Sequence, residues 1–135
     1  MYPRIEINLE NIIENAKKVK NLCEKQGVSL SLVVKMLADD KEIVQALAEN
    51  GIDCICDSRM INLKSYQTIP VEKWLIRIPM LSEAEEVVKY ADASLNSEIK
   101  VIKKLNEEAK KQRKRHKVIL THCRHSAPCA DPCQV

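Results

Sequence analysis

The sequence predicts an α/β fold built from parallel strands that alternate with helices. Short runs of apolar and β-branched residues, typical of strands buried on both faces, begin roughly 18 to 24 residues apart. Amphipathic segments with helical spacing lie between them, as in repeated strand-helix units. Such units form either an open doubly wound sheet or a (β/α)8 barrel, and the pattern alone leaves both open.

Length and composition fit this fold class. The 135 residues are enough for one domain, and 45% hydrophobic with 30% charged residues is typical of a globular protein. Five strands are recognisable in the sequence, whereas a barrel has eight strands in about 250 residues. If the fold is a barrel, the chain is therefore roughly its first half.

Each element has its own local signal. Apolar residues recur at helical spacing over residues 9–23, and Gly27 follows as a C-terminal cap. The next helix begins at Asp39 or Asp40, whose side chains suit an N-cap, and ends at Gly51. Further helices are expected over residues 58–66, from the capping-box pair Ser82 and Glu85 onward, and over 97–111. Strands are expected over residues 30–34, 52–56, 74–78, 93–95 and 117–120.

Composition excludes several classes of function. Only two glycines are present, so neither a P-loop nor a Gly-rich dinucleotide loop can form. A net charge of +3 is too small to indicate a polyanionic partner. No apolar run reaches the ~18 residues of a membrane span, and the first residues lack the order of a signal peptide. We therefore expect a cytoplasmic protein with no membrane partner.

Lys35 is the position that says most about function. It directly follows Leu32-Val33-Val34, at the carboxyl end of the first predicted strand, where both architectures place ligands. Lysine amines attack aldehydes and form Schiff bases when burial or neighbouring cations lower their pKa. The alternative is a lysine that simply ends a strand in solvent.

Arg77 interrupts an otherwise apolar run, Leu75-Ile76-Arg77-Ile78. An unpaired buried charge is costly, so the guanidinium either reaches solvent at the strand end or meets an anion. Arg77 is thus either a structural residue or a cation that binds an anionic ligand group. Four further polar residues follow or end predicted strands and could line the same rim, although helix capping explains each of them better: Asp57, Ser58, Ser94 and Asn96.

Two other segments have compositions that are associated with binding. Residues 110–117 are strongly basic but lack interleaved aromatic residues, so we interpret them as a solvated helix end and expect no nucleic-acid partner. The tail carries zinc-binding residue types, namely His122, Cys123, His125, Cys129 and Cys133. Because their spacing lacks a C-x2-C pair and no regular element fixes them, we expect no metal site.

Several motifs occur in order along the chain and together resemble one known family. They are YPRIEINL at residues 2–9, Asn11 and Asn15 in the first helix, LVVK at 32–35, DSR at 57–59, LIRIPM at 75–80 and YADASLNS at 90–97. Over about residues 1–120 they are similar to the alanine racemase-like, fold-type III pyridoxal-phosphate enzymes, and most similar to their ornithine racemase branch. The residues after Lys35, Met36-Leu37-Ala38-Asp39, differ from those of alanine racemase itself, which weakens alanine as a substrate.

The resemblance implies both a fold and an activity. It implies the amino-terminal half of a (β/α)8 barrel in which Lys35 holds pyridoxal 5′-phosphate through a Schiff base and Arg77 contacts the cofactor. The implied activity is racemisation of a small amino acid, ornithine-like by preference, in an enzyme that is a homodimer when intact. Lys35 would act on one face of the substrate, and the family's opposing tyrosine belongs to a separate carboxy-terminal domain.

The last residues depart from the family. Relatives continue after the fifth strand with an Asp-Leu-Gly-Asp-Leu-Arg-Glu-Gly type of segment, and nothing similar follows Leu120. We therefore expect a partial barrel domain over 1–120 and an irregular tail over 121–135, the result of a truncation, frame shift or fusion. Such a fragment should have little or no racemase activity alone. A non-catalytic pyridoxal-phosphate carrier and an inert structural fragment are the alternatives.

Overall fold

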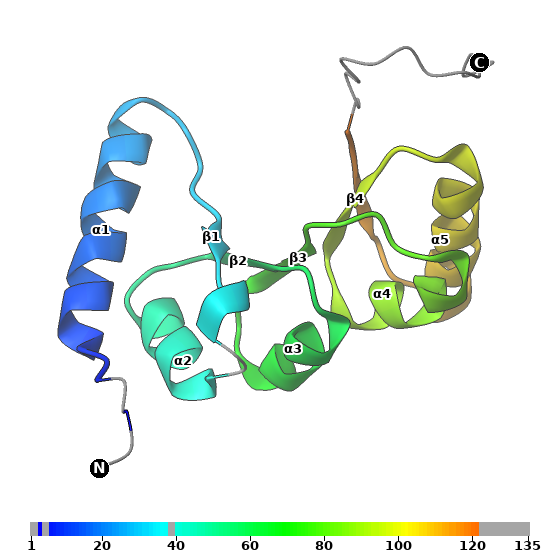
Figure 1. Ribbon diagram of the computed structural model, residues 1–135. Helices are drawn as coiled ribbons and strands as arrows, with labels where there is room; N and C mark the ends of the chain where they lie inside the picture. Colours follow the sequence, from blue (N-terminus) through cyan, green and yellow to red (C-terminus); the bar gives the residue numbers. More distant parts are fainter. Residues whose placement is uncertain (1–2, 4–5, 38–39, 122–135) are drawn as a thin grey trace.

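The computed structural model describes residues 3, 6–37 and 40–121. Over these residues the chain forms a five-stranded parallel sheet in the order β1-β2-β3-β4-β5 (Figure 1). The strands are β1 (Leu32–Val33), β2 (Cys54–Asp57), β3 (Glu72–Leu75), β4 (Ala93–Asn96) and β5 (Lys117–Leu120). The α-helices of this part are α1 (Leu9–Lys25), α2 (Lys41–Glu49), α3 (Met60–Ser65), α4 (Ala84–Tyr90) and α5 (Ile99–Gln112). Because each strand pairs with the next one along the chain, this is the amino-terminal half of a (β/α)8 barrel.

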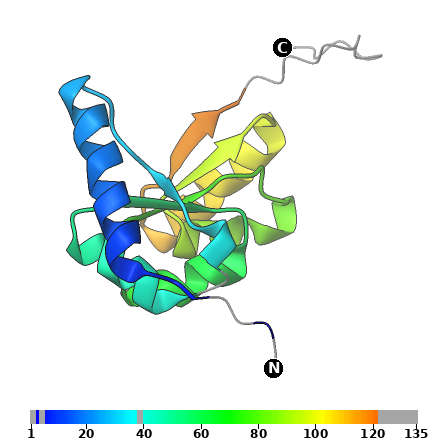
Figure 2. The same ribbon diagram turned by 60° about the vertical axis from the view of Figure 1, so that its left-hand side comes forward.

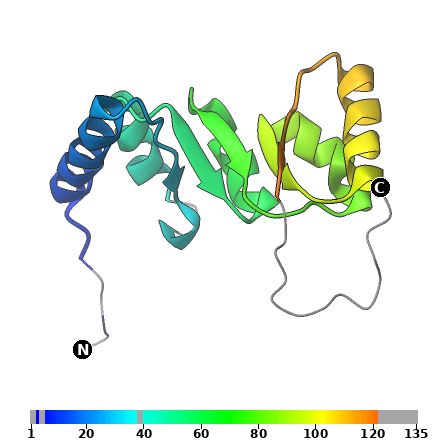
Figure 3. The ribbon, with the colours of Figure 1, turned by 90° about the horizontal axis from the view of Figure 1, so that it is seen from above.

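The helices cover one face of the sheet and leave the other face open. Figure 3 shows them along the outer side of a curved row of strands. One apolar core joins α1 and α2 to β1 and β2, and a second joins α3, α4 and α5 to β3. Ile55 and Leu75 on the helix side are 0% exposed, whereas Val33 on the open face is 54% exposed. Each large apolar side chain buried in these cores contributes about 1.5–3 kcal/mol.

The structure confirms the predicted cap residues Asp40, Gly27 and Gly51, and it adds Asn8 as the N-cap of α1, which was not predicted. Asn8 Oδ1 accepts a hydrogen bond of 2.9 Å from the amide three residues further along. Asp40 Oδ1 accepts bonds of 3.1 and 3.2 Å from the amides two and three residues further along. Gly27 and Gly51 follow the two helices with φ of +67° and +90°, a left-handed conformation that glycine adopts without strain.

Four of the five strands differ by one to three residues from their predicted bounds, and only β5 matches them. β3 begins at Glu72, two residues earlier than predicted, and ends at Leu75, three residues earlier. Its start was not recognised because the charged pair Glu72-Lys73 does not fit the apolar pattern of a buried strand. The chain leaves the sheet at Ile76, and so the last apolar residues of the predicted strand lie beyond it. β1 contains only Leu32–Val33, although the Val34 amide still donates to the Cys56 carbonyl at 2.9 Å.

The capping box predicted at Ser82 and Glu85 is wrong. A 3₁₀ turn, η3 (Leu81–Glu83), precedes α4, and Glu83 is the acidic residue that reaches back along the chain. Its Oε2 accepts a hydrogen bond of 2.9 Å from the Met80 amide. The glutamate thus lies two residues earlier than the sequence pattern indicated.

The two edges of the sheet are β1 and β5. Figure 2 shows β5, in orange, at the end of the row of strands. Its side chains are poorly covered, with Val118 36% and Leu120 73% exposed. Among the described residues no strand pairs with the outer side of either edge strand.

Some predictions concern residues that the structure does not describe. Asp39 and the tail from His122 onward lie outside the described residues, so the tail and the division of the chain near Leu120 stay predictions. Within the described ranges, no helix has the length and apolar character needed to cross a membrane.

Candidate functional site

The carboxyl ends of all five strands meet at one edge of the sheet. Because every neighbouring pair of strands is parallel, the residues that follow or end the strands lie along the same rim. In strand order they include Lys35, Asp57, Arg77, Asn96 and Thr121. The structure therefore brings the predicted site residues to one edge, as parallel barrels do with their active sites.

Lys35 lies where the sequence places it, directly beyond the first strand. It begins a 3₁₀ turn, η1 (Lys35–Leu37), which the Leu37 amide closes by donating to the Val34 carbonyl at 2.9 Å. Val34 is 2% exposed and anchors the turn, whereas the Lys35 side chain is exposed. No hydrogen bond or ion pair holds the Lys35 ammonium within the described part of the chain. The Lys35 amine is thus accessible from solvent at the carboxyl edge.

Asp57 holds the turn between β2 and α3. Its carboxylate is fully buried, with Oδ1 accepting from the Arg59 amide at 2.7 Å and Oδ2 from the Asn62 amide side chain at 2.9 Å. Asn62 is itself 4% exposed. Both oxygens thus help to position the start of α3, but neither bond is the N-cap bond that was expected of Asp57, because the N-cap of α3 is Arg59 and has no side-chain cap.

The guanidinium of Arg77 forms an ion pair with Glu83. Its Nη1 and Nη2 donate to the two carboxylate oxygens of Glu83 at 2.8 and 2.6 Å, and its Nε donates to the Ser58 carbonyl at 2.8 Å. This forked bond is the main reason that the pKa of Glu83 lies below its usual value and the pKa of Arg77 above it. Arg77 therefore ties β3 to the segment after β2 and to η3.

One N–H group of Arg77 has no partner among the described residues. A fourth bond, from Nη1 to the Ile78 carbonyl at 3.3 Å, brings the engaged N–H groups to four of the five that a guanidinium has. The remaining N–H belongs to Nη2. The structural and the cofactor-binding interpretations of Arg77 are thus compatible, and its role toward a cofactor stays a prediction.

Ser94 and Asn96 belong to a buried polar row under the helices. Asn96 Nδ2 donates to both the carbonyl and the hydroxyl of Ser94 at 2.9 Å. The Ser94 hydroxyl lies 2.8 Å from His116 Nε2, and His116 Nδ1 lies 3.1 Å from the Ala91 carbonyl. Asn96 Oδ1 is buried with no hydrogen-bond partner among the described residues. These two side chains hold β4 to β5 and do not act as helix caps.

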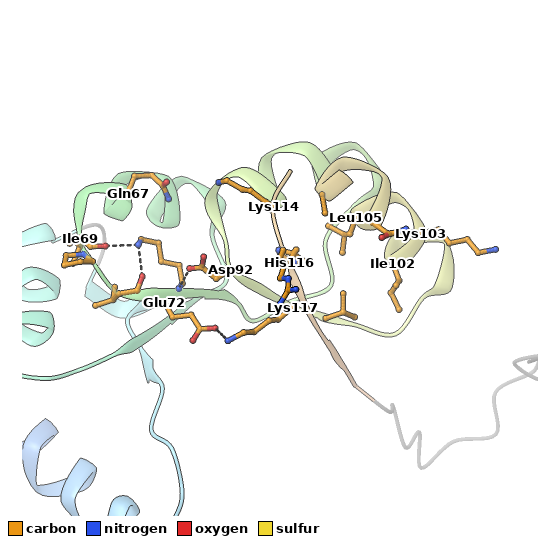
Figure 4. A pocket seen from close by; sticks show the side chains of 17 residues that line it. Gln67, Ile69, Glu72, Asp92, Ile102, Lys103, Leu105, Lys114, His116 and Lys117 are labelled. Carbon is orange, nitrogen blue, oxygen red and sulfur yellow. Dashed lines mark hydrogen bonds and ion pairs between the residues drawn. The ribbon is translucent and has the colours of Figure 1, made fainter. Parts of the chain in front are cut away.

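The opposite edge of the sheet carries a hollow of about 1170 Å³ (Figure 4). Its polar lining comes from the starts of β3, β4 and β5, where Glu72 and Lys117 form an ion pair of 2.6 Å. Lys73 is 7% exposed there and donates to the carbonyls of Ile69 and Val71 at 2.8 Å each. Burial lowers the pKa of Lys73. This hollow lies away from Lys35, because it is at the amino-terminal end of the strands.

Sequence reasoning missed the partners of the site residues. It did not pair Arg77 with Glu83, and it gave no role to Asn62, Lys73 or His116. The one available signal was the acidic residue six positions after Arg77, across a segment that contains Pro79 and reverses direction. Lys73 and His116 have no local signal, because only the fold brings backbone carbonyls to them.

The prediction about metal binding concerns two parts of the chain. In the described ranges, no three His, Cys, Asp or Glu side chains are grouped closely enough to hold a metal ion. The histidines and cysteines of the tail lie outside those ranges. The absence of a metal site in the tail therefore stays a prediction.

The structure is a parallel half-barrel in which an exposed lysine, Lys35, follows the first strand at the edge where barrel enzymes place their active sites. The chain belongs to the family described as "Alanine racemase, N-terminal domain", which matches residues 7–122. The resemblance found in the sequence and the half-barrel that it implied are both confirmed.

Two curated relatives are racemases. Over 120 residues the chain is 47% identical to the ornithine racemase of Acetoanaerobium sticklandii, covering 89% of this chain and 34% of that protein. Over 121 residues it is 33% identical to the lysine racemase of Thermotoga maritima, covering 88% of this chain and 34% of that protein. The chain thus spans about a third of the length of these relatives.

A solved structure has the same fold. PipY of Synechococcus elongatus, determined without PLP, matches with a TM-score of 0.63 and 15% sequence identity. The match covers 76% of this chain and 51% of that chain. The likeness concerns the arrangement of strands and helices.

Proposed function

We propose that this chain is the lysine-bearing half-barrel of a pyridoxal-phosphate-dependent amino-acid racemase whose substrate is ornithine-like. The observation that carries the proposal is Lys35, which follows the first strand at the carboxyl edge with its ammonium unengaged by the described residues. Family membership and the 47% identity to an ornithine racemase support it.

The residues of the carboxyl edge fit the cofactor. A primary amine that is exposed and free of ion pairs can bond to the cofactor's aldehyde carbon, and Lys35 meets this requirement. The remaining Nη2 donor of Arg77 suits an anionic oxygen, and the Glu83 carboxylate fixes the guanidinium plane. We assign Lys35 the covalent bond and Arg77 one charged hydrogen bond.

The reaction requires a proton to leave and return at the substrate's α-carbon. When bound, pyridoxal phosphate supplies the electron sink that makes this proton removable. Lys35 would hold and move the proton on one face of the α-carbon. A second group must act on the opposite face, and in the proposed whole enzyme it comes from residues beyond this half-barrel.

Borohydride reduction tests the cofactor assignment. The test requires a chimera in which residues 1–120 replace the matching third of the Acetoanaerobium sticklandii ornithine racemase, to which they are 47% identical. Reduction in the presence of pyridoxal phosphate, followed by peptide mapping, should place the pyridoxyl group on Lys35. Lys35→Ala should remove the label, whereas Arg77→Gln should weaken cofactor binding and leave any label on Lys35. A label on another lysine of the unmodified chimera would refute the assignment.

Deuterium exchange tests the substrate. The chimera should incorporate solvent deuterium at the α-carbon of ornithine faster than at that of alanine. Because the remainder of the chimera also contacts the substrate, the unaltered parent enzyme is the reference for the ratio. Faster exchange with alanine would contradict the ornithine-like substrate. Cofactor binding without exchange of either amino acid would favour a non-catalytic pyridoxal-phosphate carrier.

The 135-residue chain by itself should bind the cofactor poorly. We expect slow, substoichiometric labelling spread over several lysines, because a site with few contacts provides little binding free energy to offset the cost of association. The homodimer of the whole enzyme is likewise part of the proposal, and size-exclusion chromatography of the chimera tests it.

A further inference from the structure

Cys54 and Cys56 share the open face of the sheet. They lie two residues apart on β2, and side chains at that spacing point to the same face of a strand. Their partners in the register are Glu72 and Trp74 of β3. Since Ile55 between them is buried against the helices, the two thiols lie on the face away from the helices.

The two thiols are close to each other and to a hollow. Their positions on one face of β2 bring the two thiols near each other and, through the pairing of Leu32 with Ile55, near Ser31 of the neighbouring segment. They are only 7% and 3% exposed, yet Cys54 lines a hollow of about 730 Å³ together with Ser31, Glu72 and Lys117. This hollow is separate from the carboxyl edge, because the strand residues that line it come from the first halves of the strands.

The strand geometry opposes a disulfide between them. Residues two apart on a strand have Cα atoms about 6.6 Å apart, which is near the upper limit of the 4.4–6.8 Å that disulfides span. Their Cβ atoms also point the same way and not toward each other. The pair is therefore held as a dithiol.

We propose that Cys54 and Cys56 together bind a single soft monovalent cation, Cu(I), in two-coordinate form. Thiolates select such ions over hard cations. A zinc ion needs four ligands, and within the described residues no third His, Cys, Asp or Glu completes a metal-binding group. Glu72, the nearest carboxylate across the strand, is engaged by Lys117 at 2.6 Å.

Charge supports a monovalent ion. Two thiols lose two protons as one Cu(I) binds, so the complex carries one negative charge and no electron is transferred. Glu72 and Lys117, which form an ion pair of 2.6 Å, both act electrostatically on Cys54 but in opposite directions.

The test is a Cu(I) titration of the full chain under anaerobic conditions against a coloured Cu(I) chelator. The other four cysteines are first replaced by serine: Cys23, Cys123, Cys129 and Cys133. This variant should take up one ion per chain, with an apparent affinity that rises with pH. Cys54→Ser and Cys56→Ser should each weaken binding by at least roughly 100-fold, because losing even an outer partner of a metal ligand costs about 10–100-fold.

Two controls keep the test decisive. Circular dichroism melts establish that each serine variant is folded, so lost binding is not lost structure. The chain with Cys54→Ser and Cys56→Ser but its other cysteines intact measures binding elsewhere. Three results would each overturn the proposal. They are a Cys54→Ser or Cys56→Ser variant that binds Cu(I) as tightly as the variant with both cysteines, one ion shared by two chains, and tighter binding of Zn(II) than of Cu(I).

Discussion

Two lysines at opposite edges of the sheet have opposite environments. Lys35 at the carboxyl edge is exposed, and its ammonium has no partner among the described residues. Lys73 at the amino edge is buried and donates to two backbone carbonyls at 2.8 Å. Burial lowers the pKa of Lys73, a property that often marks functional lysines. Yet the Lys73 ammonium holds the segment before β3 in place. A lowered pKa therefore does not by itself identify the lysine of the proposed site, and position in the fold is the better guide.

The largest expected effect concerns activity. In the chimera with the ornithine racemase, Lys35→Ala should reduce the rate of ornithine racemisation by at least about 100-fold, since it removes both the covalent attachment and an acid/base group. Lys73→Met should leave kcat within about threefold, because acid/base catalysis does not involve the amino edge. Polarimetry or chiral chromatography measures both rates.

This prediction is matched to its control. Lys73→Met is expected to lower stability, so both rates are measured at a temperature where circular dichroism shows the variants folded. A folded Lys73→Met variant with the larger loss of kcat would reverse the assignment of the two lysines.

For stability the order of the two lysines should be reversed, so that substitution of Lys73 has the larger effect and substitution of Lys35 the smaller one. Lys73→Met removes both of these bonds, although the Ile69 carbonyl keeps the Val71 amide as a donor at 2.9 Å, and should lower the free energy of unfolding by about 1–3 kcal/mol. Lys35→Met removes no contact and should stay within about 0.5 kcal/mol of the parent. Urea unfolding of the 135-residue chain measures both values. Equal losses would show that Lys35 is also a structural residue.

The order and type of the elements follow from local patterns. The caps at Asn8, Asp40, Gly27 and Gly51 are short-range interactions, and the sequence contains their signals. β3 was misplaced because Lys73 is a charged residue in a buried position. Its burial depends on carbonyls in the preceding loop, and no periodic pattern encodes such a contact.

The candidate site was predictable only in part. Lys35 could be found because a lysine after an apolar strand combines with family motifs on either side of it. The pairing of Arg77 with Glu83 could not, because it depends on how the segment between them turns after β3. The buried row of Asn96, Ser94 and His116 joins two strands through a crossover helix, which sequence spacing does not specify.

Breaking the ion pair between Arg77 and Glu83 should lower the free energy of unfolding moderately, and by more at pH 7 than at pH 3. The pKa of Glu83 is lowered chiefly by its bond to Arg77, so the stability it provides is present above the unfolded glutamate pKa of about 4.3. That stability is lost as the pH falls through the folded pKa. At pH 7, Arg77→Gln should cost about 1 kcal/mol, a value discounted for partial exposure.

Unfolding curves at pH 7 and at pH 3 measure this effect. The loss of stability on acidification should be smaller in Arg77→Gln than in the parent chain. Glu83→Gln is the matched control, because it removes the titrating group and should flatten the same part of the profile. If the two substitutions together cost as much as the sum of each alone, Arg77 and Glu83 are not energetically coupled.

The smallest expected effect concerns His116, which burial keeps neutral. Its Nδ1–H donates to the Ala91 carbonyl, so in the neutral form Nε2 accepts from the Ser94 hydroxyl. Protonation would place a second N–H against that hydroxyl, whose oxygen already accepts from Asn96. Burial lowers the pKa of His116 despite the opposing effects of the Ala91 carbonyl and Asp92.

A histidine with a lowered folded pKa stabilises the fold above its unfolded pKa of about 6.5, and this contribution is lost as the pH falls through the folded value. The thermal midpoint should therefore decrease between pH 7.5 and 5.5. His116→Gln removes the titration and should reduce the decrease, whereas a substitution of the exposed Lys35 should not change it. An unchanged decrease in His116→Gln would mean that other groups, and not the row beneath the helices, sense pH in this range.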